Sequence, residues 1–238
     1  FLVMTPITTW AGPLEDASET ARLLAILLDA GRGTIAKNQD LINDASKADK
    51  GYTSAVFQQQ VAEDFQRRTG ITLTNLDGAQ IPEMAKPLLA RLMQEAKKTI
   101  DTYQSVINVS GFAYKGLIPA TFGTETASRF QTWSGIYMKQ TAPPHLVHNP
   151  RNKPDEYESA ALSRFATSNS GQAPDSVLSE VTDDGKTVRV LLPLFYKKAC
   201  LSCHGEPKGQ RDISGYPREG AKEGELGGAI SVKITPPQ

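Results

Sequence analysis

The sequence predicts an α+β fold, with long helices in the N-terminal half and an antiparallel sheet in the C-terminal half. Three observations predict it: amphipathic segments that recur in the first half, a Pro-rich loop after residue 140, and β-rich runs joined by a short turn near the C-terminus. The chain has 238 residues, enough for one or two domains with ordinary cores.

The charge balance narrows the classes of partner. Lys and Arg together number 26, and so do Asp and Glu. A nucleic-acid-binding protein, or one held by charge on anionic lipid, would have a basic excess. The longest apolar run, residues 23–28, is far shorter than the roughly 20 residues needed to cross a bilayer. We therefore expect no nucleic-acid partner and no membrane-spanning segment.

The first half contains an internal repeat at an offset of 65 residues. Residues 23–71 align without a gap on residues 88–136, and 19 of the 49 positions are identical, against roughly 3 expected by chance. Each copy is predicted to hold a long helix, a Lys-Gly turn, a second helix and the start of a strand. We divide the chain into a helical unit, residues 1–80, and a second domain, residues 81–238, which contains the second copy.

Local signals bound the helices of both copies. In the first copy, a long helix is predicted for residues 18–43, and a second helix with an apolar stripe ends at Gly70. In the second copy, a helix follows Pro82 and runs towards Asn108. Pro87 is expected to kink its first turns.

The C-terminal half combines a loop, a short helix and antiparallel strands. Prolines within residues 141–154 exclude a regular helix or a central strand, and a short helix is predicted for 155–165. The β-rich runs 179–182 and 187–191 flank an Asp-Asp-Gly-Lys turn, which predicts a hairpin. Residues 227–234 are predicted to form a closing strand.

The strongest functional motif is Cys200-Leu201-Ser202-Cys203-His204, which contains the only two cysteines of the chain and one of its three histidines. Cys-x-x-Cys-His is typical of c-type haem attachment: two thiols reach the vinyl groups of one porphyrin edge, and the imidazole of the next residue binds the iron. We predict one covalent haem c on Cys200 and Cys203, with His204 as the proximal iron ligand.

The compartment follows from this chemistry, because thioether attachment takes place outside the cytosol. The first residues of the sequence lack the basic and apolar regions of a secretion signal, so any signal is expected to have been removed or never to have been present. The protein is expected to be periplasmic or otherwise exported.

Two other uses of the motif remain open. A structural zinc site needs four ligands, and only His145 and His148 are left to complete the set. A thioredoxin-like thiol pair sits at the start of a helix, whereas the residues after His204, Gly-Glu-Pro-Lys-Gly, do not resemble a helix start.

Beyond the motif, the C-terminal half is similar to a bacterial family of single-haem c-type domains with a PAS-like fold. The similarity covers about residues 85–238 and rests on an ordered series of stretches: 115–122 (Lys-Gly-Leu-Ile-Pro-Ala-Thr-Phe), 149–158 (Asn-Pro-x-Asn-x-Pro-Asp-x-x-Glu), Pro193, 200–205, and 212–220 leading into 224–231. It implies a PAS-like antiparallel sheet that carries a covalently bound c-type haem. Members often have Arg where this chain has His148, and a helical cysteine that serves as second axial ligand, which this chain lacks.

The sixth iron ligand therefore has several candidates. His145 and His148 are the best donors, since two imidazoles give a low-spin haem suited to electron transfer. Met84, Met93 and Met138 are further candidates, although a methionine at helical spacing more often fills a core. A site with no side chain, or a weakly bound one, is the other alternative.

Polar residues flank the motif in the sequence. Acceptor side chains in the Pro-rich loop are expected to brace it rather than to contact haem; they are Asn149, Asn152, Asp155 and Glu158. Basic residues beside the motif either pair with haem propionates or lie on a solvated strand edge; they are Arg189, Lys197 and Lys198.

These observations predict an exported monohaem c-type cytochrome that exchanges single electrons with a protein partner. The alternative is a haem-based sensor of redox state or of a small diatomic ligand, as PAS-like families often are sensors. A catalytic haem is less favoured because the sequence names no distal acid/base pair. The mixed-charge loop 218–223 is a candidate rim for partner docking.

Overall fold

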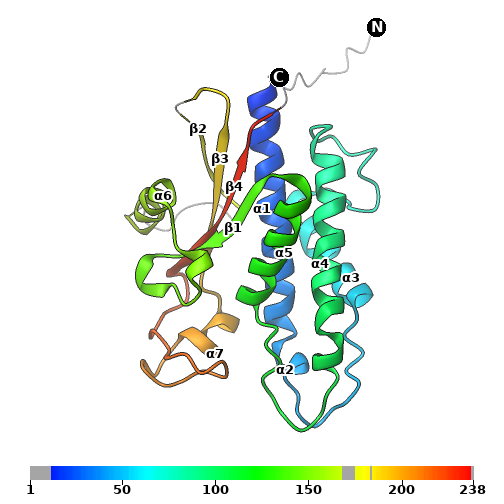
Figure 1. The fold of residues 1–238 in the computed structure, drawn as a ribbon, viewed down its shortest axis with the longest axis vertical. Helices are drawn as coiled ribbons and strands as arrows, with labels where there is room; N and C mark the ends of the chain where they lie inside the picture. The colour runs from blue at the N-terminus through cyan, green and yellow to red at the C-terminus, as the bar shows by residue number, and fades with distance from the viewer. Residues whose placement is uncertain (1–11, 168–174, 183, 237–238) are drawn as a thin grey trace, which may run out of the picture.

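The computed structural model describes residues 12–167, 175–182 and 184–236. Helices pack beside a four-stranded antiparallel sheet, and a further helix lies on the opposite side of the sheet (Figure 1). The helices are α1 (Pro13–Lys37), α2 (Gln39–Ile42), α3 (Ser54–Thr69), α4 (Ala85–Ile107), α5 (Pro119–Ser134), α6 (Glu156–Thr167) and α7 (Leu201–His204). The strands are β1 (Tyr137–Thr141), β2 (Leu178–Val181), β3 (Val188–Phe195) and β4 (Leu226–Ile234). The predicted α+β class is confirmed.

The sheet is buried on both faces. Its strand order is β1-β4-β3-β2, with every neighbouring pair antiparallel. Because side chains alternate along a strand, Val190 and Val232 join the core beneath α1, while Leu191 and Ala229 pack in a smaller core under α6. The two central strands are therefore apolar at almost every position.

The predicted hairpin and closing strand are present as β2, β3 and β4. In the turn between β2 and β3, the carboxylate of Asp184 accepts backbone hydrogen bonds from Lys186 and Thr187 at 2.8 and 2.9 Å. Asp183 of this turn lies outside the described residues.

The second helices of the two sequence copies correspond residue for residue. α3 and α5 begin and end 65 positions apart, and each ends at a glycine of positive φ, 76° at Gly70 and 72° at Gly135. That conformation is the usual one for a glycine that ends a helix. Phe57 of α3 packs on its counterpart Phe122 of α5, with ring centroids 5.2 Å apart.

Polar contacts between the copies are reciprocal. The backbone N–H of Lys50 donates to Oδ1 of Asn108, and that of Lys115 donates to Oδ1 of Asn43, each over 3.2 Å. The two lysines occupy equivalent positions in the two copies, and so do the two asparagines. Each copy therefore donates the same hydrogen bond to the other. Such exchange is the pattern of two similar units packed about an approximate two-fold axis.

Three local expectations differ from the structure. The first long helix is interrupted at Asn38, which separates α1 from α2. The strand start predicted at the end of each copy is present only in the second, as β1; after Gly70 the chain forms turns. Pro87 lies in the first turn of α4, where a helix N–H has no partner inside the helix and proline is tolerated.

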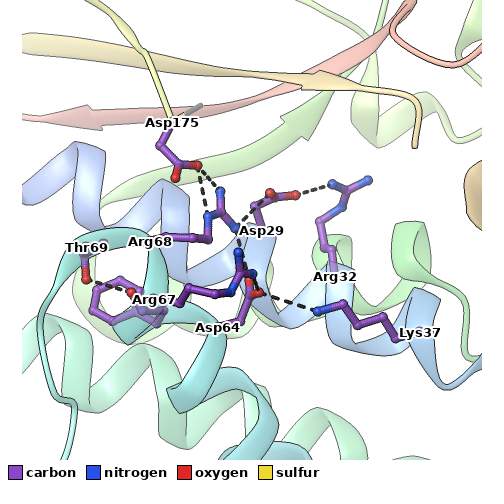
Figure 2. A network of polar contacts seen from close by, with 9 residues as sticks. Asp29, Arg32, Lys37, Asp64, Arg67, Arg68, Thr69 and Asp175 are labelled. Carbon is purple, nitrogen blue, oxygen red and sulfur yellow. Dashed lines mark hydrogen bonds and ion pairs between the residues drawn. The ribbon is translucent and has the colours of Figure 1, made fainter. Parts of the chain in front are cut away.

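An ion-pair network fastens α3 to α1 and to the segment before β2 (Figure 2). Arg68 lies 3.1 Å from Asp29 and 3.6 Å from Asp64, and its Nε donates to Asp175 over 3.0 Å. Arg32 extends the network by donating to Asp29 and, through Nε, to Gln140 of β1 over 3.0 Å. The Arg68 side chain is only 11% exposed, so these carboxylates are needed to offset the cost of burying its charge.

Candidate functional site

The Cys-x-x-Cys-His motif follows strand β3 on two short helical turns, below the sheet in Figure 1. A 3-10 turn, η3 (Lys198–Cys200), runs directly into α7. The spacing of three residues places Cys200 and Cys203 on one side of this segment. Both thiols are free and half-buried. They are available to bind a common group.

Glu219 orients the imidazole of His204. Its Oε2 lies 2.9 Å from Nδ1 of His204, and the ring of Tyr196 packs beside the imidazole with centroids 4.9 Å apart. An ionised carboxylate only accepts hydrogen bonds, so Nδ1 carries a hydrogen, and in the neutral ring Nε2 keeps a free lone pair. His204 thus has one nitrogen suited to binding a metal.

The other oxygen of Glu219 faces His148. Oε1 lies 3.2 Å from Nε2 of His148, whose ring stacks on Tyr216 with centroids 4.3 Å apart and an interplanar angle of 7°. This oxygen is buried and accepts no hydrogen bond. Two histidines far apart in the sequence therefore meet at one carboxylate.

Backbone hydrogen bonds hold the loop that carries Glu219. The N–H of Gly209 donates to the carbonyl of Arg218, and the N–H of Ala221 donates to the carbonyl of His204, each over 2.8 Å. The second bond ties this loop to the last residue of the Cys-x-x-Cys-His motif. The position of the carboxylate is consequently set by the backbone on both sides.

The site is poorly solvated at its inner side. Burial raises the pKa of the Tyr196 hydroxyl, and the negative charge of Glu219 raises it further. Burial also raises the pKa of the Cys203 thiol, with a smaller contribution from Asp212. The Cys203 sulfur therefore stays protonated when it is unmodified at neutral pH.

Comparison with known proteins places this geometry in a family. The model of the family described as Tll0287-like matches residues 11–235. The chain belongs to the Tll0287-like family. A solved structure described as the crystal structure of the cyanobacterial heme-protein Tll0287 is similar, with a TM-score of 0.44 and 20% identity, over 67% of this chain and 99% of that one. A comparison with curated proteins finds no match.

The family match extends the resemblance seen in the sequence. The motifs indicated residues 85–238, whereas the Tll0287-like model also covers α1, α2 and α3. The helical unit in front is therefore part of what this family shares.

The predicted distal candidates are placed very differently. In this Tll0287-like chain, both histidines are exposed: His148 lies beside Glu219, whereas His145 lies on the 3-10 turn η1 (Pro144–Leu146). Met93 and Met138 are buried in the core beneath α1, and Met84, at the start of α4, packs against the same core. All three methionines are thus core residues, as their spacing suggested.

Arg189 matches neither of its two predicted roles. It is buried, and its Nη2 lies 2.8 Å from Asp155 and 3.3 Å from Glu158. Asp155 and Glu158 in turn exchange side-chain to backbone hydrogen bonds of 2.8 and 3.0 Å at the start of α6. These residues brace the fold, because the buried charges of Arg189 and Glu158 pair with one another and the more exposed Asp155 adds a second ion pair to Arg189.

The rest of the Pro-rich loop is braced in the same manner. Asn149 accepts a hydrogen bond from the backbone N–H of Arg151 over 3.0 Å, and Asn152 lies within 3.2 Å of the Thr124 hydroxyl on α5. Lys197 and Lys198 are exposed beside the motif.

Sequence reasoning missed the part played by Glu219. It assigned the mixed-charge loop 218–223 to partner docking, yet the Glu219 side chain is only 18% exposed and contacts both histidines. Lys222 and Glu223 of that loop are exposed. The available indication in the sequence was Gly220, directly after Glu219, because a glycine permits a turn of the chain. Gly220 has a φ of 78° in the structure.

The donor set fits the predicted haem. Nε of Arg218 is a buried donor without a hydrogen-bond partner among the described residues, and a haem propionate is an acceptor that would satisfy it. Burial raises the pKa of the 37% exposed Tyr114, with smaller contributions from Asp212, Tyr216 and Cys203, so its ring lies near the motif. Free thiols, an imidazole nitrogen and exposed aromatic rings lie together, as a covalently held porphyrin requires.

The described residues contain no cluster of three or more His, Cys, Asp or Glu side chains arranged to hold a metal ion. Among the same residues, no helix has the length and apolar character needed to cross a membrane.

Proposed function

We propose that this protein is an exported monohaem c-type cytochrome that exchanges single electrons with a protein partner. Cys200 and Cys203 would hold one haem covalently, and His204 would bind its iron. Bound haem supplies one-electron exchange between ferric and ferrous iron. The observation that carries the proposal is the pair of free thiols on one helical segment, followed by a histidine whose Nε2 is left unengaged.

The surroundings support a carrier that keeps its cofactor. Covalent attachment retains the haem in both oxidation states, and aromatic rings pack beside the two histidines at the site. The exposed Lys197, Lys198, Lys222 and Glu223 form a charged rim next to the motif. A small, polar rim suits a brief redox encounter.

Export follows from the attachment chemistry, and we propose a periplasmic or similar location for that reason. The test is the distribution of covalent haem in the native host: the haem-containing form should appear only in the exported fraction.

Haem attachment itself has a direct test. Acid-acetone extraction of the denatured protein should leave haem on the chain. The double variant with Cys200→Ala and Cys203→Ala should lose its haem in the same extraction. Ser202→Ala, between the two cysteines, is the matched control and should keep its haem. Purified protein that contains zinc in place of iron would end the proposal.

A sensor is the second candidate, and one observation favours it. α1 contacts η3, and the positive charge of Arg32 on α1 partly offsets the raised pKa of Tyr196 next to His204. A change at the motif can therefore reach the longest helix of the protein. Hydrogen exchange of α1 in the oxidised and reduced forms discriminates: equal protection supports the carrier, and a change supports the sensor.

A further inference from the structure

We infer that Glu219 is the positioning residue of His204: its carboxylate fixes the imidazole and lowers the midpoint potential of the iron that His204 would bind. This inference rests on the proposed function, because it assigns a role within the same site. It adds a determinant of the potential that lies outside the Cys-x-x-Cys-His motif.

The first step is the hydrogen bond itself. Nδ1 of His204 donates to Oε2 of Glu219 over 2.9 Å, which leaves Nε2 as the only ring nitrogen with a free lone pair. In metal sites, a carboxylate on the far nitrogen of a ligand histidine fixes the tautomer and ring orientation and makes the ligand more basic. A more basic imidazole favours ferric over ferrous iron, so the potential falls.

The second step is the placement of Glu219 independently of haem. Its loop is anchored by the bond from Ala221 N to His204 O, over 2.8 Å, and by a turn at Asp212. In this turn Oδ1 of Asp212 accepts from the backbone N–H groups of Ser214 and Tyr216, at 2.9 and 3.0 Å. The carboxylate therefore meets the imidazole without having to be ordered by the cofactor.

Gly220 makes that placement possible. It has a φ of 78°, and a Cβ there would lie 3.0 Å from Cβ of Lys208 and 3.1 Å from Oε1 of Glu206. A residue with a side chain would be strained and crowded at this position. The turn at Gly220 thus brings Glu219 and Ala221 to successive contacts with His204.

The third step concerns the strength of the effect. The Glu219 side chain is 18% exposed, and its Oε1 is buried 3.2 Å from Nε2 of His148. Partial burial weakens screening by water and salt, so the carboxylate acts on the site more strongly than a surface charge.

The experiment compares the reduction potentials of three haem-loaded proteins. Glu219→Gln removes the charge but keeps an amide oxygen that can accept from Nδ1. Glu206→Gln is the matched control, since Glu206 is an exposed carboxylate near the motif that accepts from the backbone N–H of Lys208 over 2.8 Å. At a fixed applied potential, Glu219→Gln should increase the ratio of reduced to oxidised protein at least about tenfold, or about 59 mV for one electron. Glu206→Gln should resemble the unmodified protein.

A second measurement needs no haem. In protein with Cys200→Ala and Cys203→Ala, nitrogen NMR should show His204 with its hydrogen on Nδ1. Adding Glu219→Gln should preserve this tautomer, whereas Glu219→Ala should lose it, and circular dichroism reports whether each variant folds.

The two proposals fail in different ways. Haem attached normally, with an unchanged potential in Glu219→Gln, overturns the role of Glu219 and leaves the cytochrome standing. A protein that attaches no haem overturns the proposed function, while the NMR experiment still tests the contact between Glu219 and His204. If His204 keeps its hydrogen on Nδ1 in both Glu219→Gln and Glu219→Ala, the positioning role of Glu219 is overturned.

Discussion

Phe57 and Phe122 occupy equivalent places in the two sequence copies, and their rings pack on one another with centroids 5.2 Å apart. Both side chains are fully buried. Gly31 of α1 lies under this pair: a Cβ at Gly31 would come within 2.6 Å of Cε1 of Phe122. The centre of the helical layer thus consists of two packed rings, tilted by 56° to one another, and a residue without a side chain.

Phe122→Ala should lower the free energy of unfolding by about 3–5 kcal/mol, because it leaves a cavity among rigid helices. Gly31→Ala should cost about 1–3 kcal/mol by overpacking the same place. Val56→Ala, at an exposed position of α3, is the control and should change stability by less than about 0.5 kcal/mol. Urea unfolding gives all three values, and a mild Phe122→Ala would show that the rings are not central to the core.

Asp64 should make the free energy of unfolding depend on pH in the acid range. Burial opposes its ionisation, but a hydrogen bond from Arg67 and the charges of Lys37 and Arg68 outweigh this and hold its pKa below the ordinary value of 3.8. A carboxyl whose pKa is lower in the folded than in the unfolded state stabilises the fold above the unfolded pKa, and this contribution is lost as the pH falls through the folded pKa.

Asp64→Asn should therefore be less stable at pH 7, by about 1–2 kcal/mol, and its stability should decline less steeply below pH 4. Glu83→Gln provides the control, since Glu83 is 86% exposed and its pair with Lys86 is open to solvent. Unfolding curves between pH 7 and pH 3 measure the difference; parallel pH profiles for Asp64→Asn and the unmodified protein would contradict it.

The sixth position of the proposed haem should be open or weakly held. His148 is engaged by Glu219 and Tyr216, His145 is exposed, and the candidate methionines belong to the core. Carbon monoxide should bind the ferrous protein readily, with similar rates in His145→Ala and His148→Ala. Stopped-flow measurements decide; a low-spin spectrum that disappears only in His148→Ala would instead identify His148 as the ligand.

The sequence predicted those features that depend on neighbouring residues. The thiols and the imidazole of the motif lie within five positions, and the helix end at Gly70 follows from a single glycine. The contact between Glu219 and His204 could not be predicted from the sequence. It depends on the path of the loop, which turns at Gly220.

Arg189 was misjudged for a related reason. In the sequence, an arginine among apolar strand residues suggests a position at a solvated strand edge. In the structure, two carboxylates at the start of α6 form ion pairs with it. The strand start was likewise right for the second copy and wrong for the first. Ile136 leads into β1, which pairs with β4, whereas the chain after Ile71 forms turns and pairs with no strand in the part of the chain that the structure describes.

The position of β4 in the sheet bears on how the chain is made. β4 pairs with both β1 and β3, yet it is synthesised after them. Until residues 226–234 leave the ribosome, the two earlier strands each expose an unpaired edge. Nascent or truncated chains that stop short of Leu226 would therefore be prone to self-association, and a chaperone would have its greatest effect in this interval.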